Sequence, residues 1–294
     1  MSTRYGLIGL GNVGADLARD AVSAGLDVSA FDIDRAALDR AVDAGVAPRA
    51  DASMVAAEAD VLILSLPNSP IVDRVLADGV FDSLRPGSLL IDMSTNLPAR
   101  AVSLAAEGRD RGIRVIDAPV TYGQHGLVSY VGGAGADLEH AATWLDASVV
   151  EWIHVGPNGH GQYAKLAQNM LSGVGMGIVA EVLGFARAAG LDPGTLHDAL
   201  RPTGAYSGLI ERVLPAMQER RYGSAGTMAL HAKDMGYALQ TAGDLDVRLP
   251  FTAALHDVFE QVLSVGDRRW GQTALIEWWS PSTARPDDGR GAAA

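Results

Sequence analysis

A glycine-rich turn near the start of the chain restricts the fold more than any other feature. The stretch "GLGNVG" carries glycines at positions 9, 11 and 14, between the apolar run "RYGLIGL" and a segment with helical spacing. A strand, a tight turn and a helix in this order form a dinucleotide-binding turn, in which glycine lets the backbone approach a pyrophosphate at the start of the helix. A turn that serves only packing is the alternative. We predict cofactor contacts from Gly9, Leu10, Gly11, Asn12, Val13 and Gly14.

The residue that ends the second predicted strand indicates which cofactor is used. Asp32 lies 23 residues after Gly9, at the end of the run "DVSAFDI". A carboxylate at this place can accept hydrogen bonds from both hydroxyls of a ribose and would repel a 2′-phosphate, which favours NAD over NADP. Arg35, one helical turn later, leaves NADP open. A helix cap or a solvated carboxylate is the alternative interpretation of Asp32.

Strand-like and helix-like segments alternate through the first half of the chain. The run "DVLILSLP" is apolar and contains β-branched residues, which is typical of a parallel strand buried on both faces. The runs "SLLIDMS" and "IRVIDAP" have the same form. Strands that alternate with helices predict a Rossmann-type, doubly wound α/β sheet. The predicted strands are residues 4–10, 27–33, 60–67, 88–94 and 113–119.

After about residue 155 the pattern becomes helical throughout. Glycines and a proline between residues 156 and 161 favour a hinge at the change of pattern. We predict a Rossmann-type domain over 1–160, a long connecting helix over 161–190, an all-helical domain over 191–280 and a disordered tail over 281–294. Within the helical domain, the predicted helices cover about 194–201, 206–220, 228–245 and 251–265.

Polar turns follow three of the predicted strands. Leu66 and Pro67 end one strand, and Ser94 and Thr95 follow the next. Thr121 comes after a third. In open α/β sheets, ligands bind at the carboxyl ends of the strands, so these turns suit a nicotinamide and a small substrate. A helix cap for the pair at 94–95 and an ordinary turn residue at 121 are the alternatives.

Charge and composition exclude several classes of function. The chain has 294 residues, a formal net charge of −12 and a sequence pI near 4.9, so a nucleic acid would be repelled. It has no cysteine, which excludes thiolate nucleophiles and thiolate metal ligands. The first residues lack a signal-peptide pattern, and no apolar stretch approaches the roughly 18–20 residues that span a bilayer. We expect a cytoplasmic protein without a metal, nucleic-acid or membrane partner.

Four motifs in order resemble those of one enzyme family. They are "GLGNVG", "DAPVTYG", "GHGQYAKLAQN" and "HAKDMGYA". The family usually has D-A-P-V-S-G-G, G-x-G-x-x-x-K-x-x-x-N and K-D-x-x-x-A at the last three. On these motifs the chain resembles the β-hydroxyacid dehydrogenases, which include 3-hydroxyisobutyrate dehydrogenase, tartronate semialdehyde reductase and, more distantly, 6-phosphogluconate dehydrogenase. The resemblance runs from residue 5 to about residue 265 and implies hydride transfer between a nicotinamide cofactor and a small hydroxy acid.

The resemblance also implies roles for individual residues. It implies that Lys165 is the catalytic residue and that Asn169 binds the substrate. The substrate carboxylate would bind at Thr121, Tyr122 and Gly123.

The resemblance also implies a homodimer or homotetramer, with the long helix and the helical domain at the interface. It further implies that four residues lie near the nicotinamide. For one of them, Lys233, an ordinary ion pair with its neighbour Asp234 is the alternative. The implied residues are Leu66, Pro67, Thr95 and Lys233.

The choice of lysine at position 165 agrees with a catalytic role. Only two of the chain's 23 lysines and arginines are lysines, Lys165 and Lys233. Oxidation of an alcohol requires a proton to leave oxygen, and a desolvated lysine can shift its pKa toward neutrality and carry that proton. Arginine cannot be deprotonated usefully. Lys165 and Asn169 stand four residues apart, so a helix places them on one face. A snorkelling surface lysine is the alternative.

The motif for the substrate departs from the family pattern. Thr121 replaces the usual serine, Tyr122 replaces the usual glycine, and the segment after Gly123 is shorter than in common relatives. The pocket is therefore reshaped, and Tyr122 could stack on an aromatic substrate, hydrogen-bond to a polar one or close around a small one. Two other functions stay open. One is an imine reductase-like enzyme using NADP, which Lys165 and Asp32 disfavour, and the other is a non-catalytic dinucleotide-binding interaction protein.

Overall fold

The computed structural model describes residues 2–223, 226–267 and 269–279. The tail predicted over 281–294 lies outside the described residues. The chain divides into two compact units, Met1–Leu166 and Ala167–Ala294. The first is built on a mainly parallel sheet with helices, and the described part of the second is helical, so the predicted fold class is confirmed.

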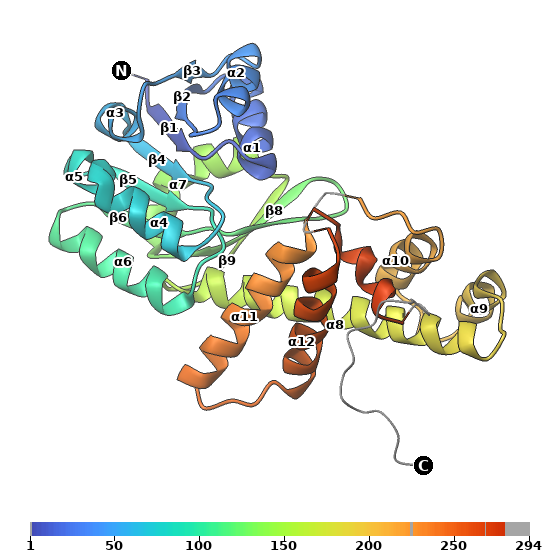
Figure 1. The fold of residues 1–294 in the computed structure, drawn as a ribbon. Coiled ribbons are helices and arrows are strands. Elements are labelled where there is room, and N and C mark those ends of the chain that lie inside the picture. Colours follow the sequence, from blue (N-terminus) through green and yellow to red (C-terminus); the bar gives the residue numbers. More distant parts are fainter. Residues whose placement is uncertain (1, 224–225, 268, 280–294) are drawn as a thin grey trace. The chain divides into compact units, whose positions relative to one another are not determined.

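The sheet of the first unit is doubly wound. Its described strands are β1 Arg4–Ile8, β2 Asp27–Phe31, β3 Ala47–Pro48, β4 Val61–Leu64, β5 Leu89–Asp92, β6 Arg114–Asp117, β7 Val120–Tyr122, β8 Leu127–Gly132 and β9 Glu151–Gly156. The order β3-β2-β1-β4-β5-β6 is parallel throughout (Figure 1). β8 then pairs antiparallel with β6 and β7 and parallel with β9. Such an order places the carboxyl ends of β1, β4, β5 and β6 at one edge, where ligands bind.

Helices cover both faces of this sheet. On one face lie α1 Asn12–Ser23, α2 Arg35–Asp43 and α7 Gly135–Ser148. On the other lie α3 Ala52–Glu58, α4 Ser69–Val75, the turn η1 Leu76–Val80, α5 Phe81–Ser83 and α6 Pro98–Asp110. Successive strand residues point to opposite faces, so Leu7 packs in one core cluster and Ile8 in the other. Burial on both faces explains why these strands read as continuous apolar runs.

The helical unit has a core of its own. Its described helices are the second part of α8 His160–Ala188, then α9 Pro193–Leu200, α10 Gly208–Gln218, α11 Met228–Asp244, α12 Pro250–Val265 and the 3₁₀ segment η2 Gln272–Trp279. Met176, Leu183, Met235 and Phe259 belong to one buried cluster. Side-chain caps start α9, α10 and α11 at Asp192, Ser207 and Thr227.

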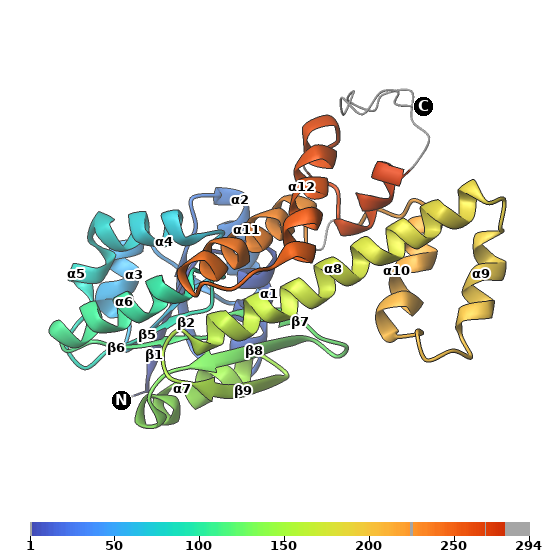
Figure 2. The ribbon, with the colours of Figure 1, turned by 90° about the horizontal axis from the view of Figure 1, so that it is seen from below.

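The helix α8 is 29 residues long and continuous (Figure 2). By length and composition it could cross a membrane, since an 18-residue window has a mean hydropathy of 1.4. The expectation that no apolar stretch approaches this length is therefore wrong by this criterion. Of that window, 44% is buried inside the structure, and Met176, Val179 and Leu183 belong to the helical core. A core helix rich in small residues meets the same criterion without a membrane.

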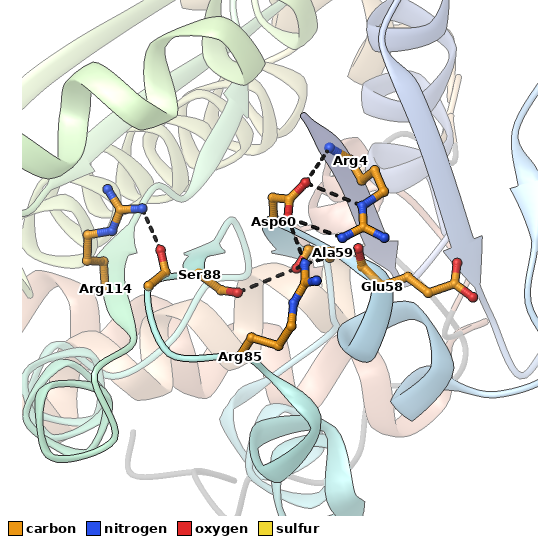
Figure 3. A network of polar contacts seen from close by, with 8 residues as sticks. Arg4, Glu58, Ala59, Asp60, Arg85, Ser88 and Arg114 are labelled. Atoms are coloured by element: carbon orange, nitrogen blue, oxygen red, sulfur yellow. Dashed lines mark hydrogen bonds and ion pairs between the residues drawn. The ribbon is translucent and has the colours of Figure 1, made fainter. Parts of the chain in front are cut away.

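Ion pairs join the strands at the amino edge of the sheet (Figure 3). Asp60 Oδ2 accepts the N–H of Arg4 at 2.9 Å, and Asp60 Oδ1 lies 2.7 Å from Arg85 Nη2. Arg85 also donates to the Ala59 carbonyl at 3.2 Å. We call Arg4, Asp60 and Arg85 the amino-edge network. Its side chains are 41–47% exposed, and it ties β1 to the segments that lead into β4 and β5.

Candidate functional site

The glycine turn between β1 and α1 has the geometry of a dinucleotide-binding turn. Gly9 has a φ of 99°, a left-handed conformation that favours glycine. A Cβ on Gly14 would lie 2.0 Å from the Gly9 carbonyl oxygen, so close packing requires glycine there. A Cβ on Gly11 would meet no atom within 4 Å, so packing within the chain does not require glycine at this position. Gly11 is also the N-cap of α1 and makes no side-chain cap, which suits a phosphate at the helix N-terminus.

Asp32 is held directly after β2. Its Oδ2 accepts the Leu10 N–H at 2.5 Å, and its Oδ1 accepts the Asp34 N–H at 2.7 Å. Next to it lies an open hollow of about 550 Å³. The structure therefore gathers several of the predicted cofactor residues around one concave surface. The lining includes Leu10, Gly11, Asn12, Asp16, Asp32, Asp34 and Arg40.

The charged side chains around this hollow are mainly acidic. Arg35, the residue that left NADP open, pairs with Asp39 at 2.9 Å on the exposed face of α2. Three carboxylates and one guanidinium, that of Arg40, line the hollow. A second phosphate on the ribose would meet a mainly negative surface.

The other predicted cofactor residues differ in their surroundings. The Leu66 N–H donates to Ser94 Oγ at 2.9 Å, which joins the turns after β4 and β5. Pro67 is exposed, and Thr95 is half-buried. The Val13 side chain packs against the core of the first unit, so only its backbone could face a phosphate.

The predicted substrate turn is a β-hairpin between β7 and β8. Thr121 is half-buried, and Tyr122 is 51% exposed. The Gly123 N–H donates to the Gly126 carbonyl at 2.7 Å, so the hairpin itself uses this amide. The Tyr122 hydroxyl donates to Asp16 Oδ2 at 3.0 Å, and burial together with this carboxylate raises the pKa of Tyr122. Tyr122 thus contacts the helix of the cofactor turn, and the substrate contacts considered for it stay predictions.

Lys165 lies on α8 and is buried, with 7% of its surface exposed. The Gly159 carbonyl accepts the N–H of Tyr163, so Gly159 is the N-cap residue of α8 and has no side chain to cap it. Asp117, at the end of β6, supplies the acceptors. Its Oδ1 accepts the Gly159 N–H at 2.7 Å, and its Oδ2 accepts the Gln162 N–H at 3.0 Å.

Asp117 belongs to a buried polar network at the carboxyl edge of the sheet. Asp92 and Asp117 are paired on β5 and β6 and are 1% and 2% exposed. Asp92 accepts the Ser94 N–H at 3.0 Å and the side-chain amide of Asn96. Burial raises the pKa of each carboxyl to about 6, against the opposing effect of their hydrogen bonds. We call Asp92, Asn96, Asp117 and Gln162 the carboxyl-edge network.

Asn169 and Lys233 lie in the helical unit. Asn169 is 2% exposed, and its Nδ2 donates to Asp234 Oδ2 at 2.7 Å. Lys233 Nζ lies 3.0 Å from Asp234 Oδ1 and 5.1 Å from the centroid of the Tyr237 ring. The ion pair considered as the alternative for Lys233 is therefore present. Asp234 links both predicted residues on neighbouring helices.

Two carboxylates of the carboxyl-edge network were missed by the sequence reasoning. Asp92 and Asp117 end the runs "SLLIDMS" and "IRVIDAP", so a shared terminal aspartate was the available signal. Asp234 was named as the ion-pair partner of Lys233, but its bond to Asn169 was not predicted. Among the described residues, no group of three or more histidine and acidic side chains could hold a metal ion.

Comparisons with known proteins agree with this geometry. Residues 4–156 match the family model of the NAD-binding domain of 6-phosphogluconate dehydrogenase. Residues 159–279 match the model described as NAD-binding of NADP-dependent 3-hydroxyisobutyrate dehydrogenase. Together the two models cover most of the chain.

Relatives that match over most of their length are also dehydrogenases. The chain is 30% identical to 2-(hydroxymethyl)glutarate dehydrogenase of Eubacterium barkeri, over 96% of each chain. It is 35% identical to NAD-dependent L-serine dehydrogenase of Pseudomonas aeruginosa, over 80% of this chain and 84% of the relative. The solved 3-hydroxyisobutyrate dehydrogenase of Mycobacterium tuberculosis with L-serine has a TM-score of 0.86 at 28% identity, over 94% of this chain and 99% of that one.

Solved imine reductases share the fold at greater distance. Four of them match at 18–20% identity, a likeness that shows the fold alone. The matched models, the relatives and the cofactor turn agree with one another. The chain belongs to the β-hydroxyacid dehydrogenase family and is an NAD(P)-dependent oxidoreductase that acts on CH–OH groups.

Proposed function

We propose that the chain interconverts a small β-hydroxy acid and its aldehyde or keto acid, with NAD preferred and Lys165 as general acid/base. The observation that carries this proposal is the burial of Lys165 on α8. A lysine removed from water gives up its proton more easily, whereas arginine, the usual cation of this chain, cannot do so. In oxidation, neutral Lys165 takes the hydroxyl proton. In reduction, its ammonium group polarises the carbonyl and protonates the oxygen.

The residues of the first unit fit a bound dinucleotide. When bound, the nicotinamide accepts a hydride from the hydroxyl-bearing carbon or returns it. The turn at Gly11 and the start of α1 would hold the pyrophosphate, and Asp32 would accept hydrogen bonds from the ribose. The negative lining of the hollow and a relative named for NAD support NAD as the preferred cofactor.

Asn169 would bind the hydroxyl or carbonyl end of the substrate. It stands four residues after Lys165 on α8, so the two share a helical face. Asp234 holds the Nδ2 of Asn169, which fixes the amide and directs its Oδ1 away from that carboxylate. The substrate carboxylate would bind near Thr121, since the Gly123 amide is used within the hairpin. Two similar proteins are named with L-serine, itself a β-hydroxy acid.

We also propose a homodimer or homotetramer. Three apolar side chains on α8 are exposed by more than half, and exposed apolar groups at helical spacing favour association. They are Leu171 at 78%, Ile178 at 54% and Phe185 at 75%.

The decisive test compares Lys165→Ala with the wild type. Initial rates are measured with NAD and with NADP across 3-hydroxyisobutyrate, L-serine, D- and L-glycerate and 3-hydroxypropionate. We expect turnover to fall by about 10²- to 10⁴-fold, the usual scale of general acid–base catalysis. Binding of NAD should stay within a few-fold, because Lys165 does not line the hollow.

Lys165→Arg is the matched control. It keeps the positive charge but cannot give up a proton, so it should be nearly as inactive as the alanine variant. Turnover near the wild-type rate in Lys165→Ala would contradict the proposal.

A further inference from the structure

We infer that Asp117 is a positioning residue, whose carboxylate fixes the first turn of α8 and thereby the place of Lys165. The inference rests on the proposed function, because Lys165 must carry the proton for its position to matter. Asp117 is on β6 and Lys165 is on α8 within the same compact unit. The carboxylate acts through the helix and has no proposed contact with the substrate.

The hydrogen bonds of the first turn carry the argument. The N–H groups that open a helix have no partner within it and need an outside acceptor. His160 donates to the Pro157 carbonyl at 3.0 Å, while Gly159 and Gln162 donate to the two oxygens of Asp117 at 2.7 and 3.0 Å. One carboxylate from a distant strand thus does what the side chain of an N-cap residue usually does. It also places a negative charge at the positive end of the helix.

Two glycines make room for this carboxylate. A Cβ on Gly161 would lie 2.7 Å from Asp117 Oδ2 and 2.5 Å from the Tyr130 carbonyl oxygen. A Cβ on Gly132 would lie 2.7 Å from Asp117 Oδ1. Any larger residue at either place would push the carboxylate from the helix. The glycine at 161 therefore serves the approach of the helix to Asp117.

A second attachment holds the same turn to the neighbouring strand. Gln162 Oε1 accepts the Asn96 N–H at 2.8 Å, and Gln162 Nε2 donates to the Ser94 carbonyl at 2.9 Å. All of these groups are buried. Lys165 follows Gln162 by three residues, less than one helical turn, so a shift of the first turn moves Lys165 with it.

The experiment replaces Asp117 with Asn and measures kcat and KM separately. Asparagine keeps the shape but offers an NH₂ where one oxygen accepted an N–H, so one bond to the first turn is lost. We expect kcat to fall by about 10- to 100-fold, since misplacement of a reacting group by 1 Å can cost that much. KM for NAD should change little, because Asp117 does not line the cofactor hollow.

Asp92→Asn is the matched control. The same change is made on the neighbouring strand at an equally buried carboxylate, whose bonds go to Ser94 and Asn96 and not to the amides of the first turn. It should lower kcat several-fold less than Asp117→Asn. Equal losses in the two variants would show a general structural role and overturn the inference.

A double-mutant cycle separates the inference from the proposed function. If Asp117 acts through Lys165, adding Asp117→Asn to Lys165→Ala should cause no further loss. A full second loss in that background, or a wild-type kcat in Asp117→Asn, would overturn the inference. A wild-type rate in Lys165→Ala alone would instead overturn the proposed function. Hydrogen exchange at the Gly159 and Gln162 amides, which should rise in Asp117→Asn, tests the attachment without any assay of activity.

A second variant tests the inference in case Asp117→Asn does not fold. Gln162→Met keeps the side-chain volume and the backbone N–H but removes the attachment to the turn after β5. It should lower kcat less than Asp117→Asn, and its loss should also vanish in the Lys165→Ala background. A loss that persists there would count against positioning.

Discussion

The two edges of the same sheet carry polar networks built on opposite principles. The amino-edge network pairs carboxylate with guanidinium (Figure 3), and its side chains are 41–47% exposed. The carboxyl-edge network has two carboxylates, amides and backbone N–H groups, and Asp92 and Asp117 are at most 2% exposed. Solvent weakens the ion pairs of the amino-edge network. In the carboxyl-edge network, a buried polar group without a hydrogen bond would cost free energy.

The pKa values of the aspartates show this difference most clearly. Burial alone would raise the pKa of Asp60, but the hydrogen bonds and charge of Arg4 and the charge of Arg85 outweigh it and lower the pKa. At the other edge burial prevails and the pKa values of Asp92 and Asp117 rise to about 6. One edge is thus built from charges that stabilise each other. The carboxyl edge holds buried carboxylates, which costs free energy when they are charged, next to the start of α8.

The largest expected difference between the edges is in the stability that is lost when one methyl group is added at a glycine. Gly161→Ala would place a Cβ against the Tyr130 carbonyl and Asp117, and we expect the free energy of unfolding to fall by about 3 kcal/mol. Gly87→Ala at the amino edge meets no atom within 4 Å and suffers only from its φ of 90°, a cost of about 1 kcal/mol. Urea unfolding measures both. A cost for Gly161→Ala no larger than for Gly87→Ala would break the comparison.

The second expected difference is in the sign of the pH dependence. Asp92 binds its proton more tightly in the folded state, so its contribution to stability is present below pH 3.8 and is lost as the pH rises through about 6. The difference in unfolding free energy between wild type and Asp92→Asn should therefore fall from pH 4 to pH 6. Urea midpoints at half-unit steps of pH measure it.

Asp60→Asn is the control with the opposite sign. Its lowered pKa stabilises the folded state above pH 3.8, and this contribution is lost as the pH falls through the lowered value. The same slope for both variants would contradict the assignment of the two networks.

The smallest expected effect is at Arg85. Replacing it with Ala removes an exposed bond to Asp60 and a partly buried bond to the Ala59 carbonyl, so the unfolding free energy should fall by about 1 kcal/mol or less. High salt should reduce the difference further, because exposed charges are screened. Thermal unfolding at low and high salt measures this, with Arg85→Lys as the variant that keeps the charge. A loss of several kcal/mol would place the amino edge in the same class as the carboxyl edge.

The sequence predicts β1, β2, β4, β5 and β6 well because local patterns mark them, but the short or antiparallel-paired strands β3, β7 and β8 and the strand β9 were not predicted. The strands read as apolar runs, and the glycine turn has a fixed spacing that the structure reproduces at Gly9, Gly11 and Gly14. The predicted helices 194–201 and 251–265 are confirmed within a residue or two as α9 and α12. Asp32, predicted from its place after a strand, lines the hollow.

The networks could not be predicted in the same way, because register and packing create them. Asp92 and Asp117 become neighbours only when β5 and β6 pair, and Gln162 joins them from another element. Nothing local marks Tyr122 as a partner of Asp16, 106 residues away. A substitution in a motif shows that a site has changed, but the new contact depends on the three-dimensional fold.

The long-range cap of α8 has a consequence for how the protein folds. Asp117 and Gly159 are 42 residues apart, so the first turn of α8 cannot be completed by local interactions as the chain collapses. Closing this loop costs entropy before its bonds form, and non-local contacts of this kind are associated with slower folding. The first turn of α8 therefore gains both of its Asp117 acceptors only when β6 is in place. An incomplete sheet would leave the Gly159 and Gln162 amides without these acceptors.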